Sequence, residues 1–155
     1  MPVVEGIAAL EPAMTDWRRH LHAHAETAFQ ERQTAAFVAA RLREFGLDVD
    51  EGLGGTGVVG TLRNGDGPAI GLRADLDGLP ITEETGLPYA STHAGRMHAC
   101  GHDGHTAMLL GAARYLAQTR RFSGTVHFIF QPAEENEGGA RVMIEQGLFE
   151  RFPVR

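Results

Sequence analysis

The sequence contains only one cysteine, Cys100. A lone cysteine cannot form a disulfide within the chain, which fits a reducing compartment, and we expect a cytoplasmic protein. No apolar run approaches the ~20 residues that a membrane-spanning helix needs. The first residues, MPVVEGIAALEPAMTDW, also lack the basic segment followed by an apolar one that marks a signal peptide. We therefore expect no membrane partner.

Positive charge is also scarce. The 155 residues include 14 Lys and Arg against 20 Asp and Glu, which gives a formal net charge of −6. Binding to phosphates needs a basic face, so this balance argues against nucleic acid as a partner. The hydrophobic fraction of 43% is ordinary for a globular protein, and the length suffices for one domain with its own core.

Apolar residues recur at helical spacing in several segments. The clearest is 31–45, which Gly46 ends as a natural helix stop. The same kind of pattern predicts three more helices, over 11–21, 106–117 and 139–146.

Three short apolar runs predict strands, over 57–62, 69–74 and 125–130. The first two are separated by the turn-rich segment 63–68, which predicts a hairpin between them. Strands that alternate with helices indicate an α/β fold, a layered mixed sheet flanked by helices.

Polar clusters lie where such a sheet places functional groups, just beyond the carboxyl ends of strands. Residues 73–77 (RADLD) follow one strand and residues 131–135 (QPAEE) follow another. A third cluster, 98–105 (HACGHDGH), precedes a helix. We expect the functional site where these three segments meet.

The segment 98–105 combines three histidines with the only cysteine. Cys100 and His102, in a Cys-x-His arrangement on a glycine-bent loop, could hold one metal ion or two adjacent ones, and zinc and related ions favour such ligands. One alternative is a helix-capping loop whose histidines are merely exposed. Another makes Cys100 a nucleophile with a histidine as its base.

Glu134 and Glu135 follow an apolar strand and a proline. Adjacent side chains point in different directions, so one carboxylate can bind a metal ion while its neighbour faces the substrate. A carboxylate beside an activated water can take its proton and hand it to a leaving amine. The alternative is solvated surface charge, which we also expect for Glu137.

Asp75 either orients a ligand side chain or accepts hydrogen bonds from nearby backbone in a turn. For Asp77 we favour the turn. Asp75 and Asp77 both follow a strand that is too apolar for a surface strand. Arg73 lies in that strand and needs an acidic partner or a substrate carboxylate, because a buried unpaired guanidinium is costly.

The remaining histidines suggest packing rather than chemistry. On a helix, positions i and i+2 do not share a face, so His20, His22 and His24 are interpreted as surface or helix-end residues. His127, inside a strand, is expected to be packed or hydrogen-bonded.

Four segments in this order resemble successive motifs of the M20 metallopeptidase family: WRRHLHAHAE, GLRADLDGLPI, MHACGHDGHTAMLLGAA and FIFQPAEE. The resemblance runs from about Trp17 to the last residues. It is strongest to the aminoacylase-like amidohydrolases, the branch that includes hippurate hydrolases and the enzymes that cleave indole-acetyl–amino acid conjugates. One departure is Ala25, where this branch usually has proline, and it concerns only a local turn.

The resemblance implies roles for individual residues. Cys100, His102 and Glu135 would be metal ligands, and Glu134 would be the general base. Asp75 would be a second catalytic acidic residue, one that supports the ligands. Arg73 stands where other branches carry a metal-binding histidine.

The resemblance also implies an activity, the metal-dependent hydrolysis of the amide bond of N-acyl amino acids such as hippurate, which releases a carboxylic acid and an amino acid. The complete site would hold two divalent ions, Zn, Mn, Co or Ni. The alternatives are an inactive metal-binding or interaction module derived from the hydrolase, and a cysteine hydrolase that uses Cys100.

In the family, a smaller lid domain that often mediates dimerisation interrupts the α/β catalytic domain. Residues 1–155 would be the N-terminal portion of that catalytic domain, without the lid and the C-terminal catalytic segment. We expect this portion alone to be inactive and the full-length protein to form a homo-oligomer.

Overall fold

The computed structural model describes residues 4–135 and 137–155. Its helices, in chain order, are α1 (Glu5–Ala8), α2 (Glu11–Ala23), α3 (Arg32–Glu44), α4 (His102–Thr119), α5 (Gly139–Glu145) and α6 (Leu148–Arg151). Its strands are β1 (Asp48–Leu53), β2 (Gly57–Asn64), β3 (Ala69–Asp75) and β4 (Gly124–Gln131). The four helices expected from periodicity are confirmed as α2, α3, α4 and α5.

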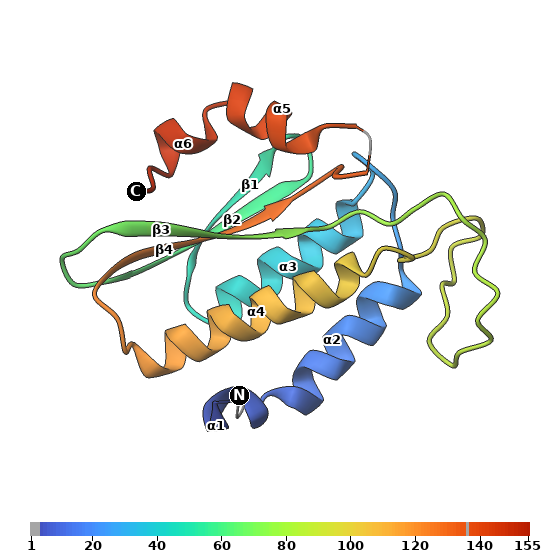
Figure 1. The fold of residues 1–155 in the computed structure, drawn as a ribbon, viewed down its shortest axis with the longest axis horizontal. Coiled ribbons are helices and arrows are strands. Elements are labelled where there is room, and N and C mark those ends of the chain that lie inside the picture. Colours follow the sequence, from blue (N-terminus) through green and yellow to red (C-terminus); the bar gives the residue numbers. More distant parts are fainter. Residues whose placement is uncertain (1–3, 136) are drawn as a thin grey trace.

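The four strands form one mixed sheet in the order β1-β2-β4-β3. β4 runs parallel to β3 and antiparallel to β2, and β1 runs antiparallel to β2. With helices on both faces, the sheet confirms the predicted fold class, a layered α/β domain with a mixed sheet (Figure 1).

The predicted hairpin is wrong, because β4 lies between β2 and β3. β2 and β4 are the two strands whose residues are buried almost throughout, so they take the two central positions. The turn residues of 63–68 show that the chain reverses there but not which strand it pairs with next. β1 was not predicted, since its sequence DVDEGL carries three acidic residues and no apolar alternation.

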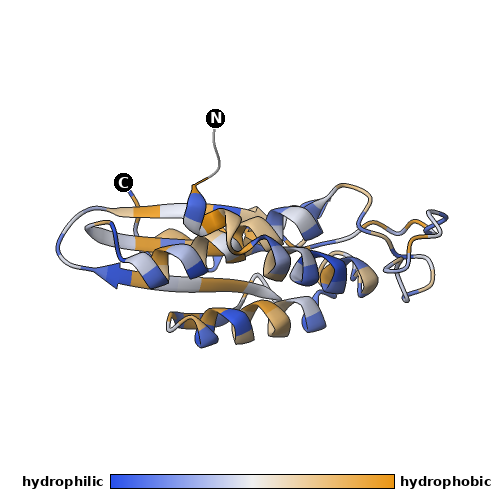
Figure 2. Cartoon of the chain, turned by 90° about the horizontal axis from the view of Figure 1, so that it is seen from below, coloured by the Kyte–Doolittle hydropathy of each residue, from blue (hydrophilic) through white to orange (hydrophobic). Residues whose placement is uncertain are grey.

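The strands alternate their side chains between two cores. Val58, Phe128 and Phe130 belong to the core that the sheet shares with α3 and α4. Val59 and Ile129 belong to the smaller core under α5 and α6, on the opposite face. Figure 2 shows the matching pattern on the helices, whose colour alternates between hydrophilic and hydrophobic along the ribbon.

β3 departs from the expectation of a covered apolar strand. It forms an edge of the sheet among the described residues, and Ile70 is 46% exposed. Burial is complete only at its carboxyl end, at Ala74 and Asp75. From there the chain enters a long irregular connection, residues 76–101, which extends away from the sheet before it returns to start α4 (Figure 1).

A bridge between Leu79 and Met97 ties the two ends of this connection together. Within the described part of the chain, no helix is both long and apolar enough to cross a membrane.

Candidate metal centre

The three polar clusters meet at one end of the sheet. The last residues of the parallel strands β3 and β4, Asp75 and Gln131, are register partners. The backbone N–H of Leu76 donates to the carbonyl of Gln131 at 3.0 Å, which keeps the two departing chains together. α4 begins beside them at His102, so that His102 and His105 both lie close to Asp75 at the end of β3.

Cys100, His102 and Glu135 lie close enough to share a cation. One potential ligand atom from each lies within 4.8 Å of those of the other two. Nε2 of His102 is 3.7 Å from Oε1 of Glu135. His102 is buried and Cys100 is exposed, so the group is anchored in the protein on one side and open on the other.

The ring of His102 is oriented for metal binding by its other nitrogen. Nδ1 donates to the backbone carbonyl of Asp77 at 2.8 Å and lies 3.3 Å from Oδ1 of the same residue. With the proton on Nδ1, the lone pair of Nε2 faces the acidic cluster, as in many metal-bound histidines. Burial by itself lowers the pKa of His102, but the hydrogen bond to Asp77 and the charge of Asp75 raise it overall.

The interpretation of Asp77 as a turn aspartate is wrong. Its side chain is buried, and Oδ2 accepts the backbone N–H of Glu135 at 3.0 Å, a contact between residues 58 positions apart. Burial alone would raise the pKa of Asp77, but hydrogen bonds from His102 and from the backbone of Glu135 and Glu134 lower it. One carboxylate therefore fixes both the histidine and the glutamate turn.

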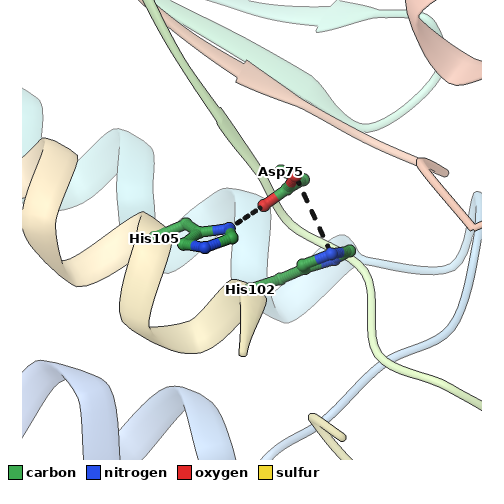
Figure 3. A group of neighbouring side chains, drawn as sticks. All are labelled: Asp75, His102 and His105. Atoms are coloured by element: carbon green, nitrogen blue, oxygen red, sulfur yellow. Dashed lines mark hydrogen bonds and ion pairs between the residues drawn. The ribbon is translucent and has the colours of Figure 1, made fainter. Parts of the chain in front are cut away.

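Asp75 lies between two histidines (Figure 3). Its Oδ1 accepts from Nδ1 of His105 at 2.7 Å, and its Oδ2 lies 3.8 Å from Nε2 of His102. These three residues form a second group that could hold a cation. Of the two interpretations left open for Asp75, the geometry favours the one in which it orients histidines.

Arg73 has the acidic partner that its position called for. Its Nη1 lies 2.9 Å from Oδ2 of Asp75, and its Nε and Nη2 donate to Oε1 of Gln131. The guanidinium thus joins the ends of β3 and β4 and fixes the outer side of Asp75.

The thiol of Cys100 lies in a strongly acidic environment. A hydrogen bond with Glu135, followed by burial and by the charges of Glu135 and Glu134, raises the pKa of Cys100 to about 11. A thiol with this pKa is protonated at neutral pH and is a poor nucleophile, which disfavours the cysteine-hydrolase interpretation. A cation would reverse the balance, since sulfur, nitrogen and oxygen donors with excess negative charge fit zinc and related ions.

The helix-capping alternative required the histidines of the 98–105 segment to be exposed, and two of the three are buried. His98 and His102 are 4% and 2% exposed. Burial is the main reason that the pKa of His98 is lowered to about 4, so this ring is neutral at physiological pH. Only His105 is exposed among the three.

His22 lies in the last turn of α2, as a helix-end histidine would, but it is not a surface residue. It is 3% exposed, with Nδ1 2.8 Å from Oδ2 of Asp103 and Nε2 3.1 Å from Oε1 of Glu83. Glu83 belongs to the long connection that leads to Cys100, so this contact fastens the connection to α2. The sequence alone gave no signal for it, because both partners are far from His22 along the chain.

The other histidines agree better with expectation. His127 is buried in β4 and its Nδ1 lies 2.9 Å from Oγ1 of Thr61, which confirms a hydrogen-bonded strand histidine. His20 and His24 are not fully buried, and their rings lie 4.4 Å apart.

The fold and the donor set are those of a metallopeptidase-type α/β domain. Residues 71–155 match the model of a family described as Peptidase family M20/M25/M40. The chain belongs to this family, and the recognition made from the four motifs is confirmed.

Relatives of known name lie in the expected branch. The chain is 50% identical over 153 residues to a hippurate hydrolase of Campylobacter jejuni, a match that covers 98% of this chain and 40% of the relative. It is 46% identical over 141 residues to an N-acyl-L-amino acid amidohydrolase of Geobacillus stearothermophilus, which covers 89% of this chain and 38% of the relative. The chain thus spans about 40% of the length of these relatives.

A solved structure agrees with the fold. The YxeP protein of Bacillus subtilis, described as a dinuclear metal binding peptidase from the M20 family, superposes with a TM-score of 0.86 at 45% identity. The superposition covers 92% of this chain and 40% of that protein.

Proposed function

We propose that this chain carries part of the active site of a metal-dependent amidohydrolase that cleaves the amide bond of N-acyl amino acids. The observation that carries the proposal is the convergence of Cys100, His102 and Glu135, three side chains with metal-ligand chemistry, beside a further glutamate, Glu134. The names of the relatives, hippurate hydrolase and N-acyl-L-amino acid amidohydrolase, support amide hydrolysis over other reactions.

Cys100, His102 and Glu135 would hold the cation, and Asp77 and Asp75 would fix the ligands. A divalent ion at this place would polarise the amide carbonyl and make water more acidic. Zn, Mn, Co and Ni all accept this combination of donors. Two such ions in the complete site would need ligands beyond these three, because a catalytic zinc commonly takes three protein ligands by itself.

Glu134 would move the proton. It is exposed, whereas its neighbour Glu135 is partly buried and lies 3.7 Å from Nε2 of His102. As a carboxylate it can take a proton from the attacking water and deliver it to the departing nitrogen. The acyl group then leaves as a carboxylic acid and the other product is the free amino acid, so the elements of one water molecule are consumed.

The chain would form the N-terminal portion of the catalytic domain. We propose that a lid domain and a C-terminal catalytic segment complete the active protein and supply the missing ligands. The coverage of about 40% of the relatives supports this division. A homo-oligomer of the complete protein is part of the same proposal.

The paired glutamates give the test. In the full-length protein, Glu134→Gln should keep the metal content but lower hydrolysis of N-benzoylglycine by about 10²- to 10⁴-fold, the usual contribution of a general base. Glu135→Gln should instead lower the metal content, since it replaces a charged ligand by a neutral one. Metal analysis and initial rates on the same preparations separate the two effects.

Glu137→Gln is the matched control, because Glu137 is an exposed glutamate in the same segment. Its metal content and rate should equal those of the unaltered protein. Full activity in Glu134→Gln would refute the assignment of the base. Normal metal loading without hydrolysis of any N-acyl amino acid by the unaltered protein would favour the inactive metal-binding module.

A further inference from the structure

Glu31 is a buried acidic residue with no role in the chemistry described above. Its side chain is 0% exposed, although carboxylates are rarely buried without a cation beside them. No Lys, Arg or His in the described part of the chain lies within ion-pair distance of it. Burial raises the pKa of Glu31, and its hydrogen bonds only partly offset that effect.

The two oxygens of Glu31 serve different segments. Oε2 accepts from the hydroxyl of Thr56, in the turn before β2. Oε1 accepts the backbone N–H of Ala133 at 2.8 Å, a contact across 102 positions of sequence. Ala133 is the residue immediately before Glu134 and Glu135, so the buried carboxyl holds the backbone from which both glutamates extend.

The backbone at Ala133 needs such support. Its φ is +52°, the left-handed region that a residue with a Cβ adopts at a cost in free energy. Its N–H is buried and would be left without a partner if Glu31 were absent, since the structure gives it no other acceptor among the described residues. On the far side of the turn, Asp77 accepts the N–H of Glu135 at 3.0 Å.

We infer that Glu31 is a positioning residue that holds the 132–135 turn in its left-handed form and thereby directs Glu134 and Glu135 into the site. The inference rests on the proposed function for what those two glutamates do. It explains why a costly buried carboxyl occurs at this point, 102 positions from the turn it supports. Mutation of a group that orients metal ligands typically lowers metal affinity by about 10- to 100-fold, so an effect of Glu31 on metal binding is expected to be measurable.

The chain supplies a matched control in Glu26. This glutamate is also buried, at 4% exposure, and also binds a threonine hydroxyl and backbone N–H groups. Its partners, however, are the nearby Gln33 and Thr34 in the first turn of α3. Glu26 therefore stabilises a helix start, whereas Glu31 reaches the catalytic turn.

The test compares variants of the two residues in the full-length protein. Three quantities are measured for each variant. Co²⁺ affinity is obtained by titration of the metal-free protein, the rate of hydrolysis is measured with N-benzoylglycine as substrate, and stability is measured by urea unfolding. Glu31→Ala should weaken Co²⁺ binding by about 10- to 100-fold, the range found for groups that orient metal ligands, and should lower kcat more than it raises KM. Glu26→Ala should lower the urea midpoint and leave Co²⁺ affinity within about twofold.

Two conservative variants keep the test decisive if Glu31→Ala does not fold. Glu31→Gln retains an acceptor for the N–H of Ala133 and should restore Co²⁺ affinity and kcat. Glu31→Asp keeps the charge but is one methylene shorter, so it should show the loss of affinity. Equal Co²⁺ affinities for Glu31→Asp and Glu31→Gln would overturn the inference, as would equal effects of Glu31→Ala and Glu26→Ala.

Glu135→Gln in the same series separates this inference from the proposed function. If Glu135→Gln binds Co²⁺ as tightly as the unaltered protein, the proposed metal site is wrong. If Glu135→Gln loses Co²⁺ while every Glu31 variant retains it, the metal site stands and the role of Glu31 is wrong.

Discussion

Gly139 offers a severe test of how the glutamate turn is held. It is the first residue of α5, and its backbone N–H donates to the carbonyl of Ala133 at 2.9 Å. A Cβ at this position would lie 1.9 Å from the carbonyl oxygen of Pro132. Ordinary van der Waals contact begins near 3.4 Å, so in Gly139→Ala either the turn or the helix must move by roughly 1.5 Å.

A movement of this size reaches the chemistry, because Pro132 begins the turn that carries Glu134 and Glu135. A misplacement of about 1 Å can cost on the order of 100-fold in rate. We therefore expect Gly139→Ala to lower hydrolysis of N-benzoylglycine by about 100-fold per folded molecule and to weaken metal binding.

Gly138→Ala is the control. Gly138 has a φ of +71°, so alanine there costs about 1–2 kcal/mol of stability. Among the described residues, its Cβ would meet only the side chain of Arg141, at 3.8 Å, and it would not contact the turn at Pro132. Urea unfolding gives the folded fraction of each variant, and rates and metal content are compared per folded molecule. Equal rates for the two variants would show that close packing of α5 against the turn does not hold the glutamates.

Two further predictions concern pH. The rate of Cys100 alkylation in metal-free protein should rise with pH toward about 11, and this profile should shift to lower pH in Glu135→Gln, since Glu135 is the main cause of the raised pKa. Bound metal should suppress the alkylation. Equal alkylation rates with and without metal would exclude Cys100 as a thiolate ligand. Burial would raise the pKa of Glu83, but hydrogen bonds from Thr85, Ser91 and His22 lower it to about 2. The stability that Glu83 contributes is thus present above pH 4.5 and lost as the pH falls toward 2. Glu83→Gln should therefore lower the urea midpoint by more at pH 7 than at pH 3. The same loss in urea midpoint at both pH values would contradict this prediction.

Periodicity and composition located most of the fold but not the order of the strands. The runs that became β2, β3 and β4 are apolar enough to be recognised individually. Their neighbours in the sheet depend on burial of both faces, a property of the packed molecule that a turn sequence does not encode. β1 could not be predicted, because an edge strand with acidic residues has neither the apolar run nor the alternation that marks a strand.

The site divides in the same way. Two pairs could be selected from the sequence because their members are adjacent or nearly so: Cys100 with His102, and Glu134 with Glu135. The roles of these four residues remain predictions. The role of Asp77 and the burial of His22 were misjudged, since each residue owes its position to a partner at least 25 positions away.

Several of the groups that hold the site are acids that act from other segments of the chain. Glu31 supports the turn at Ala133, Asp77 binds both His102 and Glu135, and Glu83 fastens the connection that ends at Cys100. Glu31 and Asp77 place a carboxylate out of water, which costs free energy unless its hydrogen bonds are well made. Among the described residues, three of the five buried acids, Glu31, Asp75 and Asp77, lie at the donors or at the turn that carries them. Strained or costly features cluster at functional sites more than elsewhere. Glu31 lies outside the four motifs, so its burial beneath the glutamate turn supports this location of the site independently of them.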